Sequence, residues 1–275
     1  MSARAETCIK TRRDGPVAII TLDRPDVLNA LNTPLMEQVT AAMREFAAAQ
    51  DVRAIVLHGS GRAFSAGFDL KESAARNIAG LEQWREVLEY DFKFLMQFWD
   101  CPKPVIAAVH GFCLAGAFEM ALSCDVTVAA EGTRFGEPEV RFGSGIVALL
   151  LPWAVGPKAA KELLLTGNDR VDATRALQLG IVNHVVPAGQ ELGKALDIAR
   201  DMAAAAPLSV ELTKRAINRT YEMMNMRQAL LAALDIDTLI EAGGGPERAE
   251  FNRIRKEQGL KAAIEWRDAR FKRTG

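Results

Sequence analysis

The sequence predicts an α/β fold for residues 1–205 and a helical region for residues 206–275. Short β-branched runs, such as VAIITL at 17–22 and DVTVAA at 125–130, alternate with helix-like segments. This alternation is typical of an α/β core in which the strands pair mainly in parallel. From residue 187 onward the strand-like runs stop, while helical periodicity continues, as in SVELTKRAINRTYEM at 209–223. We therefore place the change of character near residue 205.

The expected elements follow one another along the chain. The strand at 17–22 ends in the polar turn DRPD. Thr33 is expected to cap a helix that begins with Pro34, because apolar residues follow at helical spacing. Further strands are expected at 53–61, 102–111, 125–130 and 180–186, and further helices at 81–99, 116–123, 157–165, 172–179, 209–223 and 228–241. A C-terminal helical region that is apolar on one face either packs on the core or takes part in assembly.

Composition excludes several classes of protein. The 275 residues include 34 basic and 35 acidic side chains, so no overall charge would recruit nucleic acid or an anionic membrane. The N-terminal MSARAETCIK lacks the apolar segment of a signal peptide, and no run of eighteen apolar residues occurs. We expect a cytoplasmic enzyme or binding protein that interacts with neither nucleic acid nor membrane.

The cysteines and histidines do not indicate a metal site or a catalytic triad. The four cysteines contain no CxxC pair and lie mostly in or beside apolar segments, so we interpret them as core thiols. The three histidines, His58, His110 and His184, are far apart in the sequence, and each ends a strand-like run. They are interpreted as structural, and no metal is expected.

Two small-residue loops are candidates for an oxyanion hole. The segment GSGRAFSAGFDL at 59–70 can leave backbone amides near Ala66 and Gly67 free, because small side chains allow a ligand to approach closely. The segment HGFCLAGAFEMALSCD at 110–125 crowds small residues around Gly116 at the start of a helix, where the first amides lack intrahelical partners. Two amides from separate loops aimed at one point stabilise a developing oxyanion. Each loop taken alone is also a common packing turn.

A pair of acids follows the second loop. Glu119 lies in the first turn of the expected helix, and Glu139 follows in RFGEPEVRF at 134–142. Two carboxyl groups in a poorly hydrated pocket can share general acid and base roles. The alternative is that Glu119 only complements the helix dipole and that Glu139 is a solvated loop acid, as expected for Glu131 and Glu137.

These segments together resemble the enoyl-CoA hydratase/isomerase, or crotonase, superfamily. The similarity extends over residues of about 15 to 220 in the ordered motifs ITLDRPDVLNALNTPLM, GRAFSAGFDLKE, KPVIAAVHGFCLAGAFEMALSCDV, FGEPEV, ELLLTG, ATRALQLGIVNHVVP and LTKRAINR. The resemblance implies a crotonase-like spiral of ββα turns that forms two sheets at a steep angle. It also implies a C-terminal helical trimerisation region, so that the chain would form a homotrimer or homohexamer.

The resemblance also implies roles for individual residues. The oxyanion hole falls on the amides of Ala66 and Gly116, and the two catalytic acids fall on Glu119 and Glu139. Contacts to the substrate and its coenzyme A fall on Val27, Leu28, Ala63, Phe64, Ser65, Gly67, Phe68, Asp69 and Leu70.

The implied activity is hydration of a 2-enoyl-CoA. The thioester oxygen would lie in the hole while water, positioned between the two glutamates, adds at the β-carbon. No cofactor would be required, because coenzyme A is part of the acyl-CoA thioester substrate. The alternatives are double-bond isomerisation, dehydration or thioester hydrolysis at the same site, and a trimer that binds acyl-CoA without catalysis.

The sequence departs from the family pattern in two places. After Glu139 the Gly-rich PGxGG segment of typical hydratases is replaced by VRFGSGIVALLLPWAVG. Near the C-terminus, the Phe and Lys that reach the coenzyme A of a neighbouring subunit correspond to Ala263 and Trp266. The phosphates of coenzyme A would then depend on another cation, such as Arg267 or Lys272.

Overall fold

Two β-sheets form the centre of the protein in a computed structural model that describes residues 6–272. The larger sheet has the order β1-β2-β3-β4-β6-β9, and the smaller has the order β5-β7-β8. Within the larger sheet β1 and β2 are antiparallel and the other pairs are parallel; in the smaller sheet β5 and β7 are parallel and β7 and β8 antiparallel. The strands are β1 (Ile9–Asp14), β2 (Val17–Leu22), β3 (Ala54–Gly59), β4 (Val105–Val109), β5 (Phe112–Leu114), β6 (Val126–Ala130), β7 (Arg134–Gly136), β8 (Val171–Asp172) and β9 (His184–Val186).

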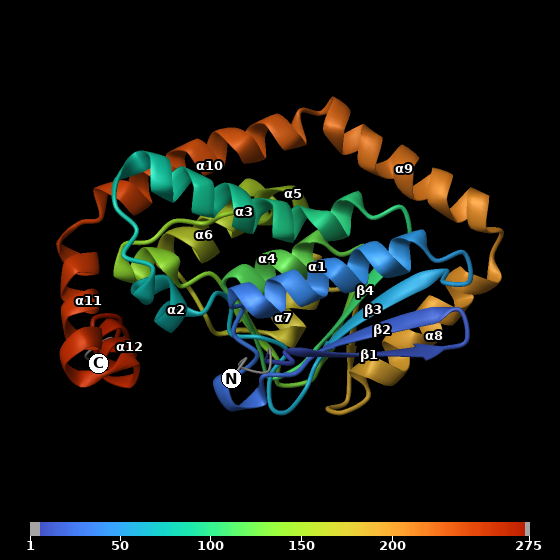
Figure 1. Ribbon diagram of the computed structural model, residues 1–275, viewed down its shortest axis with the longest axis horizontal. Coiled ribbons are helices and arrows are strands. Elements are labelled where there is room, and N and C mark those ends of the chain that lie inside the picture. The colour runs from blue at the N-terminus through green and yellow to red at the C-terminus, as the bar shows by residue number, and fades with distance from the viewer. Residues whose placement is uncertain (1–5, 273–275) are drawn as a thin grey trace, which may run out of the picture.

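Helices surround the larger sheet, and a helical region follows it (Figure 1). The helices that follow or precede strands are α1 (Thr33–Ala48), α2 (Leu70–Ala75), α3 (Gly80–Asp100), α4 (Gly116–Ser123), α5 (Leu151–Ala154), α6 (Pro157–Thr166), α7 (Ala173–Leu179) and α8 (Glu191–Ala204). The C-terminal helices are α9 (Pro207–Met223), α10 (Met226–Gly243), α11 (Pro246–Gln258) and α12 (Leu260–Ala269), and short 3₁₀ turns occur at η1 (Pro25–Val27) and η2 (Glu139–Phe142). The expected α/β fold with two sheets and C-terminal helices is confirmed.

Alternation along the strands assigns their side chains to two apolar layers. In β3, Ala54 and Val56 face α8, whereas Ile55 and Leu57 face the main core that includes α1, α3 and α4. Because both faces are covered, the parallel strands are continuous apolar runs in the sequence rather than alternating ones. Because β3 and β4 are parallel, their carboxyl ends lie at the same edge of the sheet.

Three details differ from the sequence-based expectation. Strand β1 was not expected, because IKTRRD is charged; it is an exposed edge strand whose partner, β2, supplies the burial. The cap of α1 is Asn32 rather than Thr33, since its side-chain oxygen accepts the amide hydrogen of Leu35 at 3.1 Å. The strands expected at 53–61, 102–111 and 180–186 are also shorter in the structure, where they span Ala54–Gly59, Val105–Val109 and His184–Val186.

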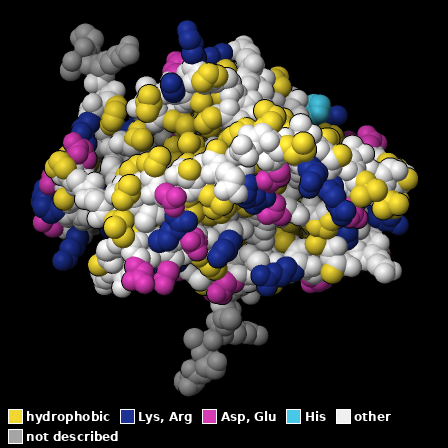
Figure 2. All heavy atoms as spheres, turned by 90° about the horizontal axis from the view of Figure 1, so that it is seen from above, with side chains coloured by type: hydrophobic (Ala, Val, Ile, Leu, Met, Phe, Trp, Pro, Cys, Tyr) yellow, Lys and Arg dark blue, Asp and Glu magenta, His cyan; other side chains and the backbone are white. Residues whose placement is uncertain are grey.

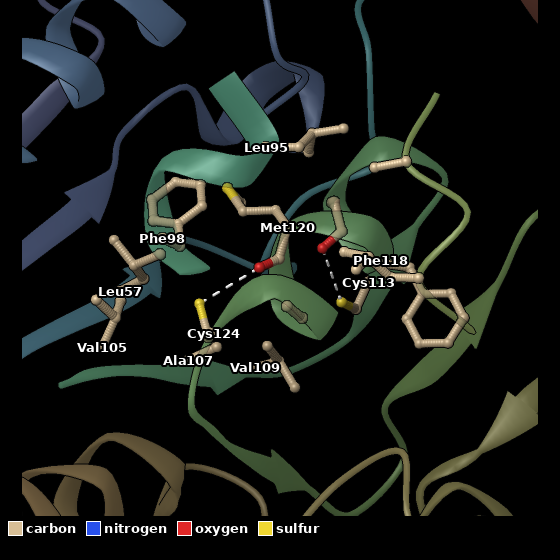
Figure 3. Packing of buried hydrophobic residues seen from close by; sticks show 14 of the residues in the cluster. Leu57, Leu95, Phe98, Val105, Ala107, Val109, Cys113, Phe118, Met120 and Cys124 are labelled. Carbon is tan, nitrogen blue, oxygen red and sulfur yellow. Dashed lines mark hydrogen bonds between the residues drawn. The ribbon is translucent and has the colours of Figure 1, made fainter. Parts of the chain in front are cut away.

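The four cysteines are buried and unpaired, as expected of core thiols. The thiol of Cys113 donates to the carbonyl of Ala117 at 3.4 Å, and that of Cys124 donates to Met120 at 3.3 Å (Figure 3). Burial raises the pKa of both thiols well above the ordinary value.

The C-terminal helices leave the core and return to it. Helices α9 and α10 arch over α3 at the top of Figure 1, and α11 and α12 come back beside α2. An ion pair of 2.7 Å between the buried ammonium group of Lys214 on α9 and the carboxylate of Asp125 joins this region to the core. Residues 6–272 include no helix with the length and apolar character needed to span a bilayer.

Candidate functional site

The two predicted loops lie against each other. The amide of Ser65 donates to Phe112 at 3.0 Å, and the amide of Leu114 donates to Ser65 at 3.3 Å. A Cβ atom on Gly67 would lie 2.5 Å from Cβ of Ala115, and Gly67 has φ of +87°. Only glycine satisfies both the close approach and the positive φ. The loops at 59–70 and 110–125 therefore form one continuous wall.

Helix α4 begins at this wall with two amides that have no backbone partner within residues 6–272. The amides of Phe118 and Glu119 both donate to Ala115, at 2.7 and 3.1 Å, so those of Gly116 and Ala117 remain. Ala115 adopts φ 56° and ψ −138°, a strained backbone for a residue with a side chain. This conformation turns the start of α4 toward the neighbouring loop. The Gly116 amide is thus available to an oxyanion.

The backbone amide of Ala66, which the sequence predicted to be free, has a hydrogen-bond partner. It donates to the carbonyl of Leu28 at 3.0 Å. Leu28 itself lies in a left-handed conformation after η1, with φ of 54°. A substrate oxygen would have to share this amide with Leu28 or displace that carbonyl.

Asn29 organises the loop and was not identified from the sequence. Its side chain is fully buried, and its amide nitrogen donates to the carbonyls of Ser60, Ala63 and Phe64 at 2.9, 2.8 and 3.2 Å. A single buried side chain thus positions the backbone that leads to Ala66. The only signal in the sequence was the position of Asn29 directly after DRPDVL, which does not reveal these long-range contacts.

The side chains expected to contact coenzyme A divide into two groups. Val27, Leu28, Phe68, Asp69 and Leu70 are at least partly exposed, whereas the side chains of Ala63, Phe64 and Ser65, and the whole of Gly67, are buried. The buried group can contribute only through its backbone. The carboxylate of Asp69 is also committed, because it caps α2 and pairs with Arg24 at 3.1 Å.

Glu119 and Glu139 are both buried, at 1% and 8% exposure. The carboxylate of Glu119 accepts a hydrogen bond from the amide of Ala148, whereas Oε2 of Glu139 has no hydrogen-bond partner within the described chain. The alternative that Glu139 is a solvated acid is therefore wrong, and so is the same expectation for Glu137, which is 2% exposed. Glu131 is exposed as expected.

Burial raises the pKa values of all three acids. The pKa of Glu119 lies well above the ordinary value, mainly because the carboxyl group is buried and also because the charge of Glu139 is near. Burial likewise raises the pKa of Glu139 to about 8, although a hydrogen bond from Glu137 partly offsets it. Glu137 has a raised pKa through burial and the nearby charges of Glu139 and Glu119. Near neutral pH the cluster therefore keeps protons that it can transfer.

The segment that replaces the expected Gly-rich loop completes this acidic site. The amide of Ala148 holds Glu119, and the amide of Gly145 donates to Glu241 on α10 at 3.2 Å. A Cβ atom on Gly145 would lie 1.9 Å from Oδ1 of Asp237, so glycine is needed there. Asp237 is 3% exposed, neither of its oxygens has a partner within residues 6–272, and burial raises its pKa to about 7. Asp237 is a further acid that the sequence did not indicate.

The two C-terminal cations expected to bind coenzyme A, Arg267 and Lys272, differ in their exposure to solvent. Arg267 is buried and pairs with Asp169 at 3.0 Å, so its guanidinium is not free to hold a phosphate within one chain. Ala263 is fully buried against α11, and Lys272 is exposed. Of the two cations expected to hold the phosphates of coenzyme A, Lys272 is accessible to solvent, whereas Arg267 is already paired with Asp169.

Comparisons with known proteins agree with this fold. The family described as enoyl-CoA hydratase/isomerase matches residues 12–272. The chain is 36% identical over 224 residues to a "Probable enoyl-CoA hydratase, mitochondrial" of Dictyostelium discoideum, covering 78% of this chain and 76% of that one. It is 37% identical over 213 residues to a "Short-chain-enoyl-CoA hydratase" of Clostridium acetobutylicum, covering 75% and 79%.

A solved structure shows the same architecture. The crystal structure of an enoyl-CoA hydratase/isomerase from Xanthobacter autotrophicus Py2 superimposes with a TM-score of 0.95 at 49% identity, covering 97% of this chain and 99% of that chain. Sequence and structure together show that this chain belongs to the enoyl-CoA hydratase/isomerase, or crotonase, superfamily.

Proposed function

We propose that this protein hydrates the double bond of a 2-enoyl-CoA. The observation that carries the proposal is the burial of two acids, Glu119 and Glu139, the first of which lies in the helix that begins with the amide of Gly116. Hydration needs a group that removes a proton from water and a group that supplies a proton to the α-carbon. Acids whose pKa values are raised by burial can do both near neutral pH.

In the proposed reaction the thioester oxygen accepts hydrogen bonds from the amide of Gly116 and from the amide of Ala66, which it shares with, or takes over from, the carbonyl of Leu28. Water between the two glutamates gives a proton to one carboxylate as its oxygen bonds to the β-carbon. The double-bond electrons move toward the thioester, and the other carboxyl group protonates the α-carbon. The negative charge that develops on the thioester oxygen is the charge that the amides stabilise, and each donor is worth about 3 kcal/mol in a water-excluded site. The proton passes between the acids to restore the starting state.

The test is turnover of short, medium and aromatic 2-enoyl-CoA substrates by the purified protein. Glu119→Gln and Glu139→Gln are each expected to lower kcat by about 10²–10⁴-fold, since general acid and base catalysis contributes that much. Glu131→Gln is the matched control, because Glu131 is an exposed acid of the same region. A protein that hydrates none of these substrates, or that tolerates both buried substitutions, would contradict the proposal.

Isomerisation at the same site is the second candidate, and Asp237 favours it. This acid interacts with both Glu119 and Glu139, has a pKa near neutrality and lies over the segment that departs from typical hydratases. A third proton-carrying group suits a reaction that moves a proton between two carbons. Mass analysis of the product separates the reactions: hydration adds the mass of water, dehydration removes it, isomerisation leaves the mass unchanged and hydrolysis releases free coenzyme A. Binding of acyl-CoA without any of these products would indicate the non-catalytic trimer.

We also propose that the protein assembles as a homotrimer or a homohexamer through its C-terminal helices. Large apolar side chains lie exposed along α9 and α10: Leu208, Leu212, Ile217, Met223, Ile236 and Leu239. Figure 2 shows hydrophobic side chains spread among charged ones over the face of the molecule seen from above. An apolar surface of this extent favours burial against another chain. Light scattering of the purified protein would distinguish a trimer or hexamer from a monomer.

The cytoplasmic location expected from the sequence remains a prediction, and the relative from Dictyostelium discoideum has "mitochondrial" in its name. The proposed chemistry requires an acyl-CoA thioester, whose coenzyme A is part of the substrate, and no separate cofactor. Imaging of a tagged full-length chain in its native host would test the location.

A further inference from the structure

Three side chains that are distant in the sequence converge at the edge of the larger sheet. His58 lies in β3, His110 follows β4, and Glu191 begins α8. The imidazole rings stack with centroids 5.1 Å apart. Oε1 of Glu191 lies 3.5 Å from Nε2 of His58 and 3.6 Å from Nδ1 of His110. The expectation that the histidines are separate structural residues thus does not hold for these two.

The hydrogen bond of Nε2 of His110 determines whether Nδ1 of the neutral ring carries a hydrogen. Nε2 of His110 lies 3.1 Å from the carbonyl oxygen of Gly61. A carbonyl oxygen only accepts, so Nε2 carries the hydrogen in the neutral ring, and Nδ1 presents a lone pair. This lone pair faces the carboxylate of Glu191, which also only accepts. Two acceptors at this distance repel each other unless a proton or a metal ion lies between them.

The cluster also contains buried atoms without partners. Nδ1 of His110 and Oε2 of Glu191 are buried and have no hydrogen-bond partner within residues 6–272. Glu191 is 5% exposed, so its carboxylate is directed into the cluster rather than into solvent. Buried charges are normally paired or bind a metal.

We propose that His58, His110 and Glu191 bind a divalent transition-metal ion of the zinc type. One ligand atom from each residue lies within 4.8 Å of the others, a separation that small side-chain movements would close to metal coordination. Two imidazoles and one carboxylate are a donor set that suits zinc, with one position left for water. The two histidine side chains are 17% and 16% exposed, so solvent reaches the cluster. The bond from His110 to Gly61 is the kind of outer contact that orients a metal-binding histidine.

His110 opens the loop at 110–125, and the three proposed metal ligands are different residues from the acids Glu119, Glu139 and Asp237. The amide of Phe64 donates to the carbonyl of His110 at 2.8 Å, and His110 holds the carbonyl of Gly61. A metal bound here would join β3, β4 and α8 and would hold the segment from Gly61 to Phe64, which leads to Ala66. It would act as a stabilising clamp, and the proposal is independent of the hydratase function.

Zinc binding to the chelator-treated, full-length protein tests the proposal. Wild-type protein is expected to bind about one zinc ion per chain in equilibrium dialysis with metal analysis, and its Tm should rise when zinc is added. His110→Gln and Glu191→Gln are expected to weaken binding by about tenfold to a hundredfold or more, and to remove the Tm shift. His184→Gln is the matched control, because His184 is an exposed histidine outside the cluster, and it should bind zinc as the wild type does.

The absorption spectrum of the Co²⁺-loaded wild-type protein tests the proposal even if a variant fails to fold. Wild-type protein loaded with Co²⁺ should show the visible bands of low-coordinate cobalt with nitrogen and oxygen ligands, and His58→Gln should weaken them. Absence of zinc binding by the wild type would overturn the proposal. Equal affinity in wild type, His110→Gln and Glu191→Gln would overturn it too, and would leave the cluster as a hydrogen-bonded histidine–glutamate network.

Discussion

Replacement of Gly67 by alanine would separate the two loops at the point where they touch. The added Cβ atom would lie 2.5 Å from Cβ of Ala115, 2.7 Å from the carbonyl oxygen of Leu114 and 3.2 Å from the amide nitrogen of Gly116. Cβ atoms in folded proteins essentially never approach other atoms more closely than 3.0 Å, so the wall must move. The atoms that must move are backbone atoms that position the Gly116 amide.

The expected cost has two parts. Alanine at φ of +87° is strained by about 1–2 kcal/mol, which is the usual penalty of a left-handed backbone with a side chain. Overpacking at a buried contact adds about 1–3 kcal/mol. Gly67→Ala should therefore lower the free energy of unfolding by about 2–5 kcal/mol. Displacement of the Gly116 amide should lower kcat by about 10²–10³-fold, the effect of losing one oxyanion donor.

Gly132→Ala is the matched control for this prediction. Gly132 has φ of +81°, close to that of Gly67, but a Cβ atom there would have no neighbour within 4 Å. It should lose only the backbone part of the stability, about 1–2 kcal/mol, and keep full activity. Urea denaturation and enoyl-CoA turnover measure the two effects. If Gly67→Ala matches Gly132→Ala in both, the contact between the loops does not position the amide.

Three further predictions concern the acids, the C-terminal helices and the loop. The pKa of Glu139 is higher in the folded chain than the ordinary 4.5, so the free energy of unfolding should fall as pH rises from about 4.5 to about 8, and Glu139→Gln but not Glu131→Gln should reduce that slope in urea titrations. Lys214→Met should cost about 1–3 kcal/mol, because the carbonyls of Phe98 and Lys103 and the carboxylate of Asp125 lose a shared donor; a Lys214→Met variant of wild-type stability in urea titrations contradicts the argument. Asn29→Ala should cost about 1–3 kcal/mol and lower turnover, because three buried carbonyls lose their donor; an unchanged melting curve would refute this role.

Local patterns in the sequence were sufficient for much of the fold and for part of the site. The predicted helix at 116–123 has the same limits as α4, and the parallel strands were evident as apolar runs because both of their faces are buried. The edge strand β1 was missed because its charged side chains face solvent. The two loops were singled out because small residues are needed wherever two backbones approach closely.

The same reasoning could not reach the contacts that tune the site. Asp237 lies nearly a hundred residues beyond Glu139, and no local pattern shows that Gly145 leaves room for its carboxyl group. The burial of Glu137, and the use of the Ala66 amide by Leu28, depend on how separate segments pack. A charged residue in a loop is usually solvated, so a sequence alone favours that interpretation.

What the sequence determined by itself is the set of local structures: helices, strands, glycines at tight turns and the ordered motifs that carry the family resemblance. These follow from backbone preference and from the periodicity of burial, which act over a few residues. Tertiary structure alone decided which buried acids share protons, which amides are free and that His58, His110 and Glu191 meet. Desolvation and charge interactions depend on distances between segments that are far apart in the chain, and only the packed fold sets those distances.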